Sequence, residues 1–475
     1  MSQGRLARLH GMKHSRWLSL VILCTGFLLI VVDMTIVNVA LPSIERDLRF
    51  TQSGLAWVVN AYLVAFAGLL LLAGRVADLV GAKRVFLLGL AIFTAASLAC
   101  GLSWSQPLLI AARFVQGIGG ALSSAVILAM IVTMFPERGD QAKAFGIFSF
   151  VASAGASVGL VAGGVITQVV SWHWIFFVNV PLGIATAILA HRMLPRSRGL
   201  GLAEGADVLG AALVTGSLMI GVYAIVSASG PIALLAAGLL GAFLVRQARA
   251  RKPILPLRLF RSPILSGANA VQALMAAAFL SFFFLASLDL ERVLGYGPLA
   301  LGLAFLPVAL VMGSFSVRFS AGLVMRFGAC RVLIAGQAVT ALALFMLAFG
   351  PEHVVYARDF LPAMALLGLG GGLCFPALTM IAMSEASPSD SGLASGLLNT
   401  AGQVGGALGL AVFATIAAAR TAALTGAGTA TLPALAGGYH AAWLVAAGTF
   451  LVTIGITVAT LRPRKAQEVA LAQAA

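Results

Sequence analysis

Long apolar runs follow one another along nearly the whole chain, separated by short gaps rich in charged residues, glycine or proline. The runs are roughly 20 residues long and lack period-2 alternation, which favours membrane-spanning helices over barrel strands. We predict fourteen spanning helices, at residues 17–41, 54–73, 84–102, 107–134, 142–170, 174–194, 206–228, 231–246, 264–288, 299–320, 331–349, 359–383, 391–418 and 440–461. The expected fold class is an all-α membrane protein.

The first run resembles a signal peptide at first sight, because Arg5, Arg8, Lys13 and Arg16 precede it. A cleaved signal has an apolar core of about 7–15 residues, and the run 17–41 is longer. We interpret it as a retained first helix. The basic stretch before it is either an amphipathic surface helix or, as we favour, the cytoplasmic anchor of that helix.

Composition supports a lipid-facing exterior. Sixty per cent of the residues are hydrophobic, 9% are charged, and the mean hydropathy is +1.03. Soluble domains carry about 25% charged residues, so this chain lacks the charge to cover a water-facing surface. Cys24, Cys100, Cys330 and Cys374 fall in or beside apolar runs without the spacing of metal ligands, and we interpret them as packing residues.

The distribution of basic residues predicts the orientation. With the N-terminus in the cytoplasm, 24 of the 30 basic residues fall on the cytoplasmic side and Arg113 lies inside a helix. The outer loops hold the rest, namely Arg46, Arg49, Arg292, Arg358 and Arg420. This bias follows the positive-inside rule and predicts a multi-pass protein of the bacterial plasma (inner) membrane with both termini cytoplasmic. Because the charge is spread over short gaps, the net charge of +15 does not indicate nucleic-acid binding.

Features of the first half recur about 250 residues later. The loop 74–84 has a degraded copy at 322–331, and the glycine-rich stretch 117–120 has a copy at 368–371. Three glycine pairs match at a single offset of 250: Gly146 and Gly396, Gly155 and Gly405, Gly159 and Gly409. Transporters are often built from such repeats. We expect a six-helix bundle at 1–200, a two-helix insert at 201–255 and a second six-helix bundle at 256–475.

Two ionisable residues inside predicted helices are candidates for proton coupling. Asp33 lies deep in the first helix, where a carboxylate costs a few kcal/mol unless it is paired, protonated or wetted. Arg113 lies in the fourth helix, where a buried guanidinium needs an anion or several carbonyls. The alternatives are structural: a hydrogen bond across helices for Asp33, and a packing clamp for Arg113.

Other polar side chains within the spans either line a substrate cavity or join helices by hydrogen bonds. The cavity candidates beside Asp33 are Asn38, Gln116, Gln272, Gln337, Asn399 and Gln403, and Asn60 belongs to the same polar group. Asp289 and Glu291 lie at the outer end of the ninth helix. We interpret them as loop charges, with a second acidic site for cations as the alternative.

Glycines mark two candidate moving parts. Gly155, Gly159 and Gly163 form a smooth stripe on the fifth helix that lets another helix approach closely, and Gly164 adds flexibility. The stripe is a hinge or seal between the halves, or packing alone. In the loop 74–84, a conformational latch through charge and helix-dipole contacts would use Gly74, Asp78, Gly81, Lys83 and Arg84. The alternative for these charges is ordinary positive-inside charge.

At these motifs the chain resembles the major facilitator superfamily, in particular the fourteen-helix drug:proton antiporters of the EmrB/QacA type. The loop 74–84 resembles the superfamily loop motif, and residues 33–42 resemble the first-helix motif of this subfamily. Arg113 with Gln116 and Gly117 resembles the fourth-helix motif, for which the family implies a part in proton coupling. The fifth-helix glycines fit the antiporter motif that is tied to export, and 172–181 resembles the subfamily's entry to helix six.

The resemblance implies alternating access around a central cavity, with export driven by proton entry. Three features depart from the family pattern: Leu160 replaces a proline of the antiporter motif, His173 stands where arginine is usual, and the second loop copy at 322–331 lacks its acid. The first departure weakens the inference of export.

We expect a proton-coupled exporter of small hydrophobic or cationic compounds, as in multidrug efflux and antibiotic resistance. The alternatives are a dedicated exporter of one metabolite or antibiotic, a proton-coupled importer or uniporter, and a transport-inactive membrane sensor. The sequence shows no nucleotide-binding loop and no catalytic constellation, so we expect no enzyme, no metal and no cofactor beyond the proton motive force. Expected partners are membrane lipid, a small-molecule substrate and protons; a periplasmic adaptor stays open.

Overall fold

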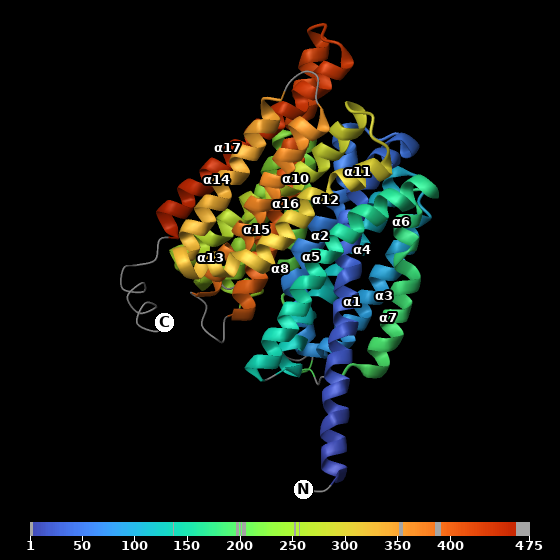
Figure 1. Cartoon of the computed structure of the whole chain (residues 1–475), viewed down its shortest axis with the longest axis vertical. Coiled ribbons are helices and arrows are strands. Elements are labelled where there is room, and N and C mark those ends of the chain that lie inside the picture. The colour runs from blue at the N-terminus through green and yellow to red at the C-terminus, as the bar shows by residue number, and fades with distance from the viewer. Residues whose placement is uncertain are drawn as a thin grey trace. The chain divides into compact units, whose positions relative to one another are not determined.

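The computed structural model describes residues 3–135, 137–195, 199, 201, 206–250, 253–255, 257–350, 355–384 and 391–461. Within these ranges the chain forms helices joined by short turns, and no strand occurs in them (Figure 1). The chain divides into two compact units, of which unit 1 comprises Met1–Leu255 with Tyr296–Leu303. Unit 2 comprises Pro256–Gly295 with Ala304–Ala475.

The elements follow the apolar runs closely. Unit 1 contains α1 (Gln3–Leu48), α2 (Gln52–Val80), α3 (Ala82–Gly101), α4 (Gln106–Met134), α5 (Arg138–Val169), α6 (Trp174–Phe177), α7 (Asn179–Met193), α8 (Val208–Val226) and α9 (Gly230–Arg249). The segment Tyr296–Leu303 of unit 1 holds nearly all of α11 (Pro298–Ala304). Unit 2 contains η2 (Leu257–Arg261), α10 (Pro263–Arg292), α12 (Leu306–Ser314), η3 (Phe315–Phe319), α13 (Ser320–Phe327), α14 (Ala329–Ala348), η4 (Tyr356–Phe360), α15 (Leu361–Ser384), α16 (Ser391–Gly426) and α17 (Thr431–Thr460).

These helices are long and apolar enough to make the chain a multi-pass membrane protein. Among the described residues, thirteen helical stretches have the length and hydropathy to cross a bilayer. The remaining predicted span corresponds to α5, a 32-residue helix whose described apolar part is Ser157–Val169. The all-α membrane fold is therefore confirmed.

Several predicted boundaries are wrong at the helix ends. The first helix is continuous from Gln3 to Leu48 and passes through Pro42, so its basic start extends the same helix. The last helix begins at Thr431 instead of residue 440, and α16 continues to Gly426 instead of ending at 418. The region around 419–438 is rich in alanine and leucine, which favour helix strongly, and the single charge of Arg420 does not stop it.

The same helix pairings occur in both units. In unit 1, α1 packs on α5, α3 on α4 and α3 on α7; in unit 2, α10 packs on α16, α14 on α15 and α14 on α17. Gly81 separates α2 from α3 with φ 102° and ψ 132°, and Gly328 separates α13 from α14 with φ 85° and ψ 145°. Only glycine adopts such a positive φ without strain. The repeat in the sequence is thus a repeat in backbone geometry.

Glycine also sets the closest helix contacts alike in both units. A Cβ atom on Gly119 of α4 would lie 2.7 Å from the carbonyl oxygen of Gly89 in α3. A Cβ atom on Gly370 of α15 would lie 2.7 Å from the carbonyl oxygen of Gly336 in α14. Both distances are too short for any real side chain, so these pairs approach through bare backbone.

The predicted insert helices α8 and α9 belong to unit 1. They pack on each other, and α8 packs on α2, where a Cβ atom on Gly68 would lie 2.9 Å from the Cβ of Thr215. At one end, Ala211, Phe243 and Ile254 form a small apolar core. The insert therefore packs as part of unit 1. The division of the chain into 1–200, 201–255 and 256–475 stays a prediction.

Candidate functional site

Asp33 is the centre of a buried polar cluster in unit 1. Its side chain on α1 is 0% exposed, and its Oδ2 accepts a hydrogen bond from Arg113 Nη1 of α4 at 2.6 Å. Its Oδ1 accepts from Gln116 Nε2 at 2.8 Å and from Asn179 Nδ2 at 3.1 Å. The carboxylate is therefore held by one cation and two amides from α4 and α7.

Arg113 is as deeply buried as the acid that it binds. Its Nε donates to the carbonyl oxygen of Val58 in α2 at 3.0 Å, and its Nη1 also donates to Gln116 Oε1 at 2.6 Å. The guanidinium lies 4.6 Å from the ring centroid of Tyr62 and 5.8 Å from that of Phe176. A positive charge over an aromatic face is attracted to the ring. Arginine suits this position because its fork of donors reaches several acceptors at once.

Gln116 connects the ion pair to α3. Its Nε2 donates to Ser97 Oγ at 2.8 Å as well as to Asp33, and its Oε1 accepts a weak contact from Cys100 Sγ at 3.6 Å. Arg113 and Gln116 are three residues apart, so they project from the same face of α4. Four helices, α1, α3, α4 and α7, thus meet at one carboxylate.

The cluster contains residues that the sequence did not single out as site residues. Asn179 of α7 bonds to Asp33, Tyr62 of α2 faces Arg113, and Ser97 of α3 accepts a hydrogen bond from Gln116. Asn179 was visible only as part of the family-like stretch 172–181. The apolar pattern of a helix does not show whether a polar residue faces this cluster or joins two helices elsewhere. The sequence therefore does not predict that these three residues belong to the site.

The charges in the cluster balance, and no part of the Asp33 side chain is exposed in this conformation. Asp33 and Arg113 thus compensate each other away from water, together with hydrogen bonds to neutral groups. The predicted proton site is therefore closed here. Proton exchange at Asp33 requires a rearrangement that separates Asp33 from Arg113 or admits water.

Three polar residues of the predicted spans are buried inside their units in this conformation. Asn38 donates to the carbonyl oxygen of Met34 in its own helix at 3.2 Å. Gln337 on α14 is 0% exposed and donates from Nε2 to Thr457 Oγ1 of α17 at 3.0 Å. Gln337 thus joins two helices of unit 2 in this conformation, and its role in a substrate cavity stays a prediction. Asn60 is also fully buried, with no hydrogen-bond partner for either side-chain atom in the described part of the chain.

Three predicted cavity residues gather on unit 2 with some exposure. Gln272 on α10 is half-buried and lies against Gly402 of α16. A Cβ on Gly402 would lie 2.8 Å from the Nε2 atom of Gln272. Asn399 is exposed and Gln403 is half-buried, and they share one face of α16 because they are four residues apart. A polar strip on α10 and α16 is the arrangement that a cavity lining needs.

The predicted latch is only partly assembled. Lys83 Nζ donates to the carbonyl oxygens of His191 at 2.7 Å and Leu194 at 2.6 Å, at the end of α7. A cation there complements the negative end of the helix. Asp78 is exposed, and Gly74 has open space around it. Within the described residues Lys83 therefore binds helix ends, whereas Asp78 forms no ion pair.

The fifth-helix glycines face two different neighbours. Gly155, Gly159 and Gly163 lie against α1, where a Cβ on Gly155 would meet Leu28 Cδ1 at 2.7 Å. Gly164 faces the start of α11, with a Cβ 2.6 Å from the carbonyl oxygen of Pro298. The stripe packs α5 on α1 inside unit 1, and the hinge role of these glycines stays a prediction.

Leu160, which replaces the motif proline, lies at the same contact. Its carbonyl oxygen would be 2.5 Å from a Cβ on Gly302, so α11 approaches α5 through bare backbone. Leucine at this position keeps an uninterrupted helix, because proline would remove a backbone donor and kink α5. The contact with α11 is made without the family proline.

His173 lies in a cluster of unit 1 beside the ends of α1 and α5. The indole Nε1 of Trp172 donates to Asp47 Oδ2 at 2.8 Å, and the His173 ring stacks on Trp172 with centroids 3.8 Å apart. Burial lowers the pKa of His173, although Asp47 and a hydrogen bond to the Ser103 backbone oppose that shift. The usual arginine would be charged at this position, whereas His173 is neutral at neutral pH.

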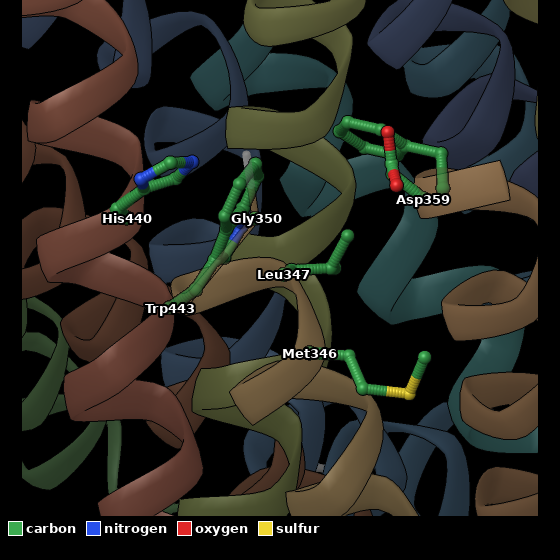
Figure 2. A pocket seen from close by; sticks show the side chains of 7 residues that line it. Met346, Leu347, Gly350, Asp359, His440 and Trp443 are labelled. Atoms are coloured by element: carbon green, nitrogen blue, oxygen red, sulfur yellow. The ribbon is translucent and has the colours of Figure 1, made fainter. Parts of the chain in front are cut away.

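A small pocket occurs in unit 2, apart from the Asp33 cluster. It is lined by Met346, Leu347, Gly350, Asp359, Phe360, His440 and Trp443, from α14, η4 and α17 (Figure 2). Its volume of about 10 Å³ for water-sized probes admits roughly one water molecule. The pocket is therefore too small for an organic substrate. Among the described residues, no group of three or more His, Cys, Asp and Glu side chains could hold a metal ion.

The chain is similar to proteins that confer antibiotic export or resistance. It is 39% identical over 462 residues to a cephamycin export protein of Amycolatopsis lactamdurans, covering 93% of this chain and 92% of that protein. It is 37% identical over 453 residues to a puromycin resistance protein of Streptomyces alboniger, covering 92% of this chain and 90% of that protein.

Solved structures share the fold at low sequence identity. The nucleoside transporter NupG superposes with a TM-score of 0.67 at 13% identity, covering 94% of this chain and all of that one. The sequence pattern of the Major Facilitator Superfamily matches residues 23–410, which include the whole Asp33 cluster and both copies of the repeated loop. The chain belongs to the Major Facilitator Superfamily.

Proposed function

We propose that this protein is a proton-coupled antiporter that exports small organic compounds, antibiotics among them, by alternating access. The observation that carries the proposal is the buried Asp33–Arg113 pair at the meeting point of four helices. Similarity to export and resistance proteins over nine-tenths of the chain supports the direction of transport. A dedicated exporter of one antibiotic is the narrower alternative, which relatives named for a single compound favour.

Charge balance suggests how a proton acts on this site. Protonating Asp33 removes the anion that compensates Arg113, and an uncompensated buried guanidinium costs several kcal/mol. The cluster then favours a conformation in which Arg113 reaches water or another acceptor. Proton binding is thereby linked to helix rearrangement, and linkage requires that rearrangement alters proton affinity in return.

The orientation belongs to the same proposal. Basic residues predominate in the gaps assigned to the cytoplasm, which supports a plasma (inner) membrane protein with both termini inside. Protons then enter from outside while the compound leaves. Each proton that moves down a potential of 100 mV releases roughly 2.3 kcal/mol. Membrane lipid and the substrate are sufficient partners for this cycle, and an adaptor is not required by it.

Proton release in inverted membrane vesicles tests the proposal. Vesicles with an imposed proton gradient receive puromycin, lincomycin or a cephamycin, and a pH-sensitive dye reports proton movement. We expect at least one compound to evoke proton release from the parent, and Asp33→Asn to reduce it about tenfold or more. Asp359→Asn is the matched control, because Asp359 lies outside the cluster and bonds to Arg358.

Two outcomes contradict the proposal at different levels. Proton release that is unchanged in Asp33→Asn removes Asp33 from the coupling step. Failure of every compound to move protons in the parent, with the protein shown to be folded in the membrane, removes the exporter itself and favours the sensor alternative.

A further inference from the structure

Asp289 is a buried acid that the Asp33 cluster does not include. It lies on α10, three residues before the end of that helix, and is 3% exposed. Its neighbours in sequence, Leu288 and Leu290, are fully buried. The prediction that Asp289 is a loop charge is therefore wrong: the side chain is part of the packed helix.

No cation or donor compensates this carboxyl in the described residues. Besides η2 at its far end, α10 packs on α15, α16 and α17. The titratable side chains on these three helices are Cys374, Arg420, Tyr439 and His440, and none of them bonds to Asp289. Glu291 and Arg292 follow on the same helix, and neither is paired with it. Asp33, by contrast, is surrounded by Arg113 and two amides.

The helix itself also disfavours a negative charge at this point. The backbone oxygen of Asp289 accepts from the N–H groups of Val293 at 2.9 Å and Leu294 at 3.3 Å, in the closing turn of α10. The C-terminal end of a helix carries a partial negative charge, so an anion there is repelled. Burial, lack of a partner and the helix end all favour the neutral carboxyl.

We propose that Asp289 is a second proton-binding site, located in unit 2 and occupied by a proton when the Asp33–Arg113 pair is closed. The inference rests on the proposed function for its role in transport. The two acids then differ in their surroundings: Asp33 is compensated by Arg113, whereas Asp289 has no cation bonded to it among the described residues and holds a proton. Because Asp289 lies toward the predicted outer end of α10, it takes its proton from the outer side.

An infrared measurement without any ligand tests the site directly. The purified full-length protein in liposomes at neutral pH is compared with Asp289→Asn, and the carbonyl stretch of a protonated carboxyl is recorded. We expect that band to be weaker in Asp289→Asn and unchanged in Asp359→Asn, whose carboxylate is bonded to Arg358 and to the Val355 N–H. A band of equal strength in the parent and Asp289→Asn overturns the proposal.

Transport separates this proposal from the function on which it rests. In inverted vesicles we expect Asp289→Asn to lower proton-driven uptake of puromycin about tenfold, with exchange of labelled puromycin at equal pH retained and with Asp289→Glu restoring uptake. Proton-driven uptake equal to that of the parent overturns the role of Asp289. If the parent moves no compound, the proposed function fails, and the infrared result still decides whether Asp289 holds a proton.

Discussion

At the scale of single residues, Asp33 and Arg113 form a buried ion pair in unit 1, with Nη1 and Oδ2 2.6 Å apart. Two charges at this separation attract strongly in a poorly polarisable interior, yet both lost their water on burial. The net contribution of the intact pair is therefore modest. Removal of one partner alone is costly, because the other charge stays buried without compensation.

Truncation of Arg113 should reveal this asymmetry. We expect Arg113→Ala to lower the free energy of unfolding by about 3–5 kcal/mol, since Asp33 retains only Gln116 and Asn179 as donors. Thermal unfolding of the purified protein in detergent measures the loss. Arg420→Ala removes an exposed arginine from α16 and should leave the midpoint nearly unchanged. Equal midpoints for the two variants would show that the ion pair is not what stabilises this cluster.

At the scale of elements, the insert helices are fixed by a polar clamp between the start of α8 and the end of α9. Asp207 caps α8 by accepting the Gly210 N–H at 2.9 Å, and it also binds Arg246 Nε at 2.5 Å and Gln247 Nε2 at 2.8 Å. Burial tends to raise the pKa of Asp207, but these three donors outweigh it and hold the pKa below its usual range. Gln247 Oε1 in turn accepts the N–H of Leu255, where the chain leaves unit 1.

The clamp should make stability depend on acid pH. Because the folded state lowers the pKa of Asp207, its contribution is complete above the unfolded value of about 3.9 and disappears as pH falls through the lower folded value. At neutral pH we expect Asp207→Ala to be less stable than the parent by roughly 1–3 kcal/mol, and this difference to shrink below about pH 4. Unfolding midpoints measured across this range check it. A constant difference at every pH would mean that the carboxylate charge contributes nothing.

At the scale of the whole molecule, the two units have the same helix pairings but different chemistry. Unit 1 contains the charged cluster and the insert, while unit 2 contains the uncharged Gln337–Thr457 contact and the polar strip of Gln272, Asn399 and Gln403. Alternating access requires each unit to move largely as one body. Because α8 packs directly on α2, the insert should move with unit 1.

A cross-link inside unit 1 tests this rigidity. We introduce Gly68→Cys and Thr215→Cys in a background in which the four native cysteines are replaced. A Cβ on Gly68 would lie 2.9 Å from the Thr215 Cβ, which is shorter than the roughly 3.5–4.5 Å of a disulfide, so α2 and α8 must separate slightly for the bond to form. We expect oxidation to join α2 to α8 without reducing vesicle transport more than about twofold. The reduced double variant is the control. Transport that stops on oxidation and returns on reduction would show that the insert moves against α2.

Much of the candidate site can be predicted from the sequence, because burying a charge within an apolar run costs free energy and marks the residue as unusual. Asp33, Arg113 and Gln116 were predicted from their positions within the spans. Asn179, Tyr62 and Ser97 were not, since they are uncharged and come from three other helices. Asp289 was misjudged because it lies near the end of a run, where sequence does not show whether neighbouring helices cover a side chain.

The sequence by itself determined the class of the molecule. Lipid cannot hydrogen-bond to the backbone, so long apolar runs must become helices. Basic residues mark the ends of these helices, and glycines repeated at fixed intervals mark their close contacts. Tertiary structure alone decided which residues meet. Residues 33, 97, 113, 116 and 179 are far apart in the chain, and only helix packing makes them one cluster. The same packing decides that one buried acid has a cation beside it and another has none, because burial and pairing depend on neighbouring helices.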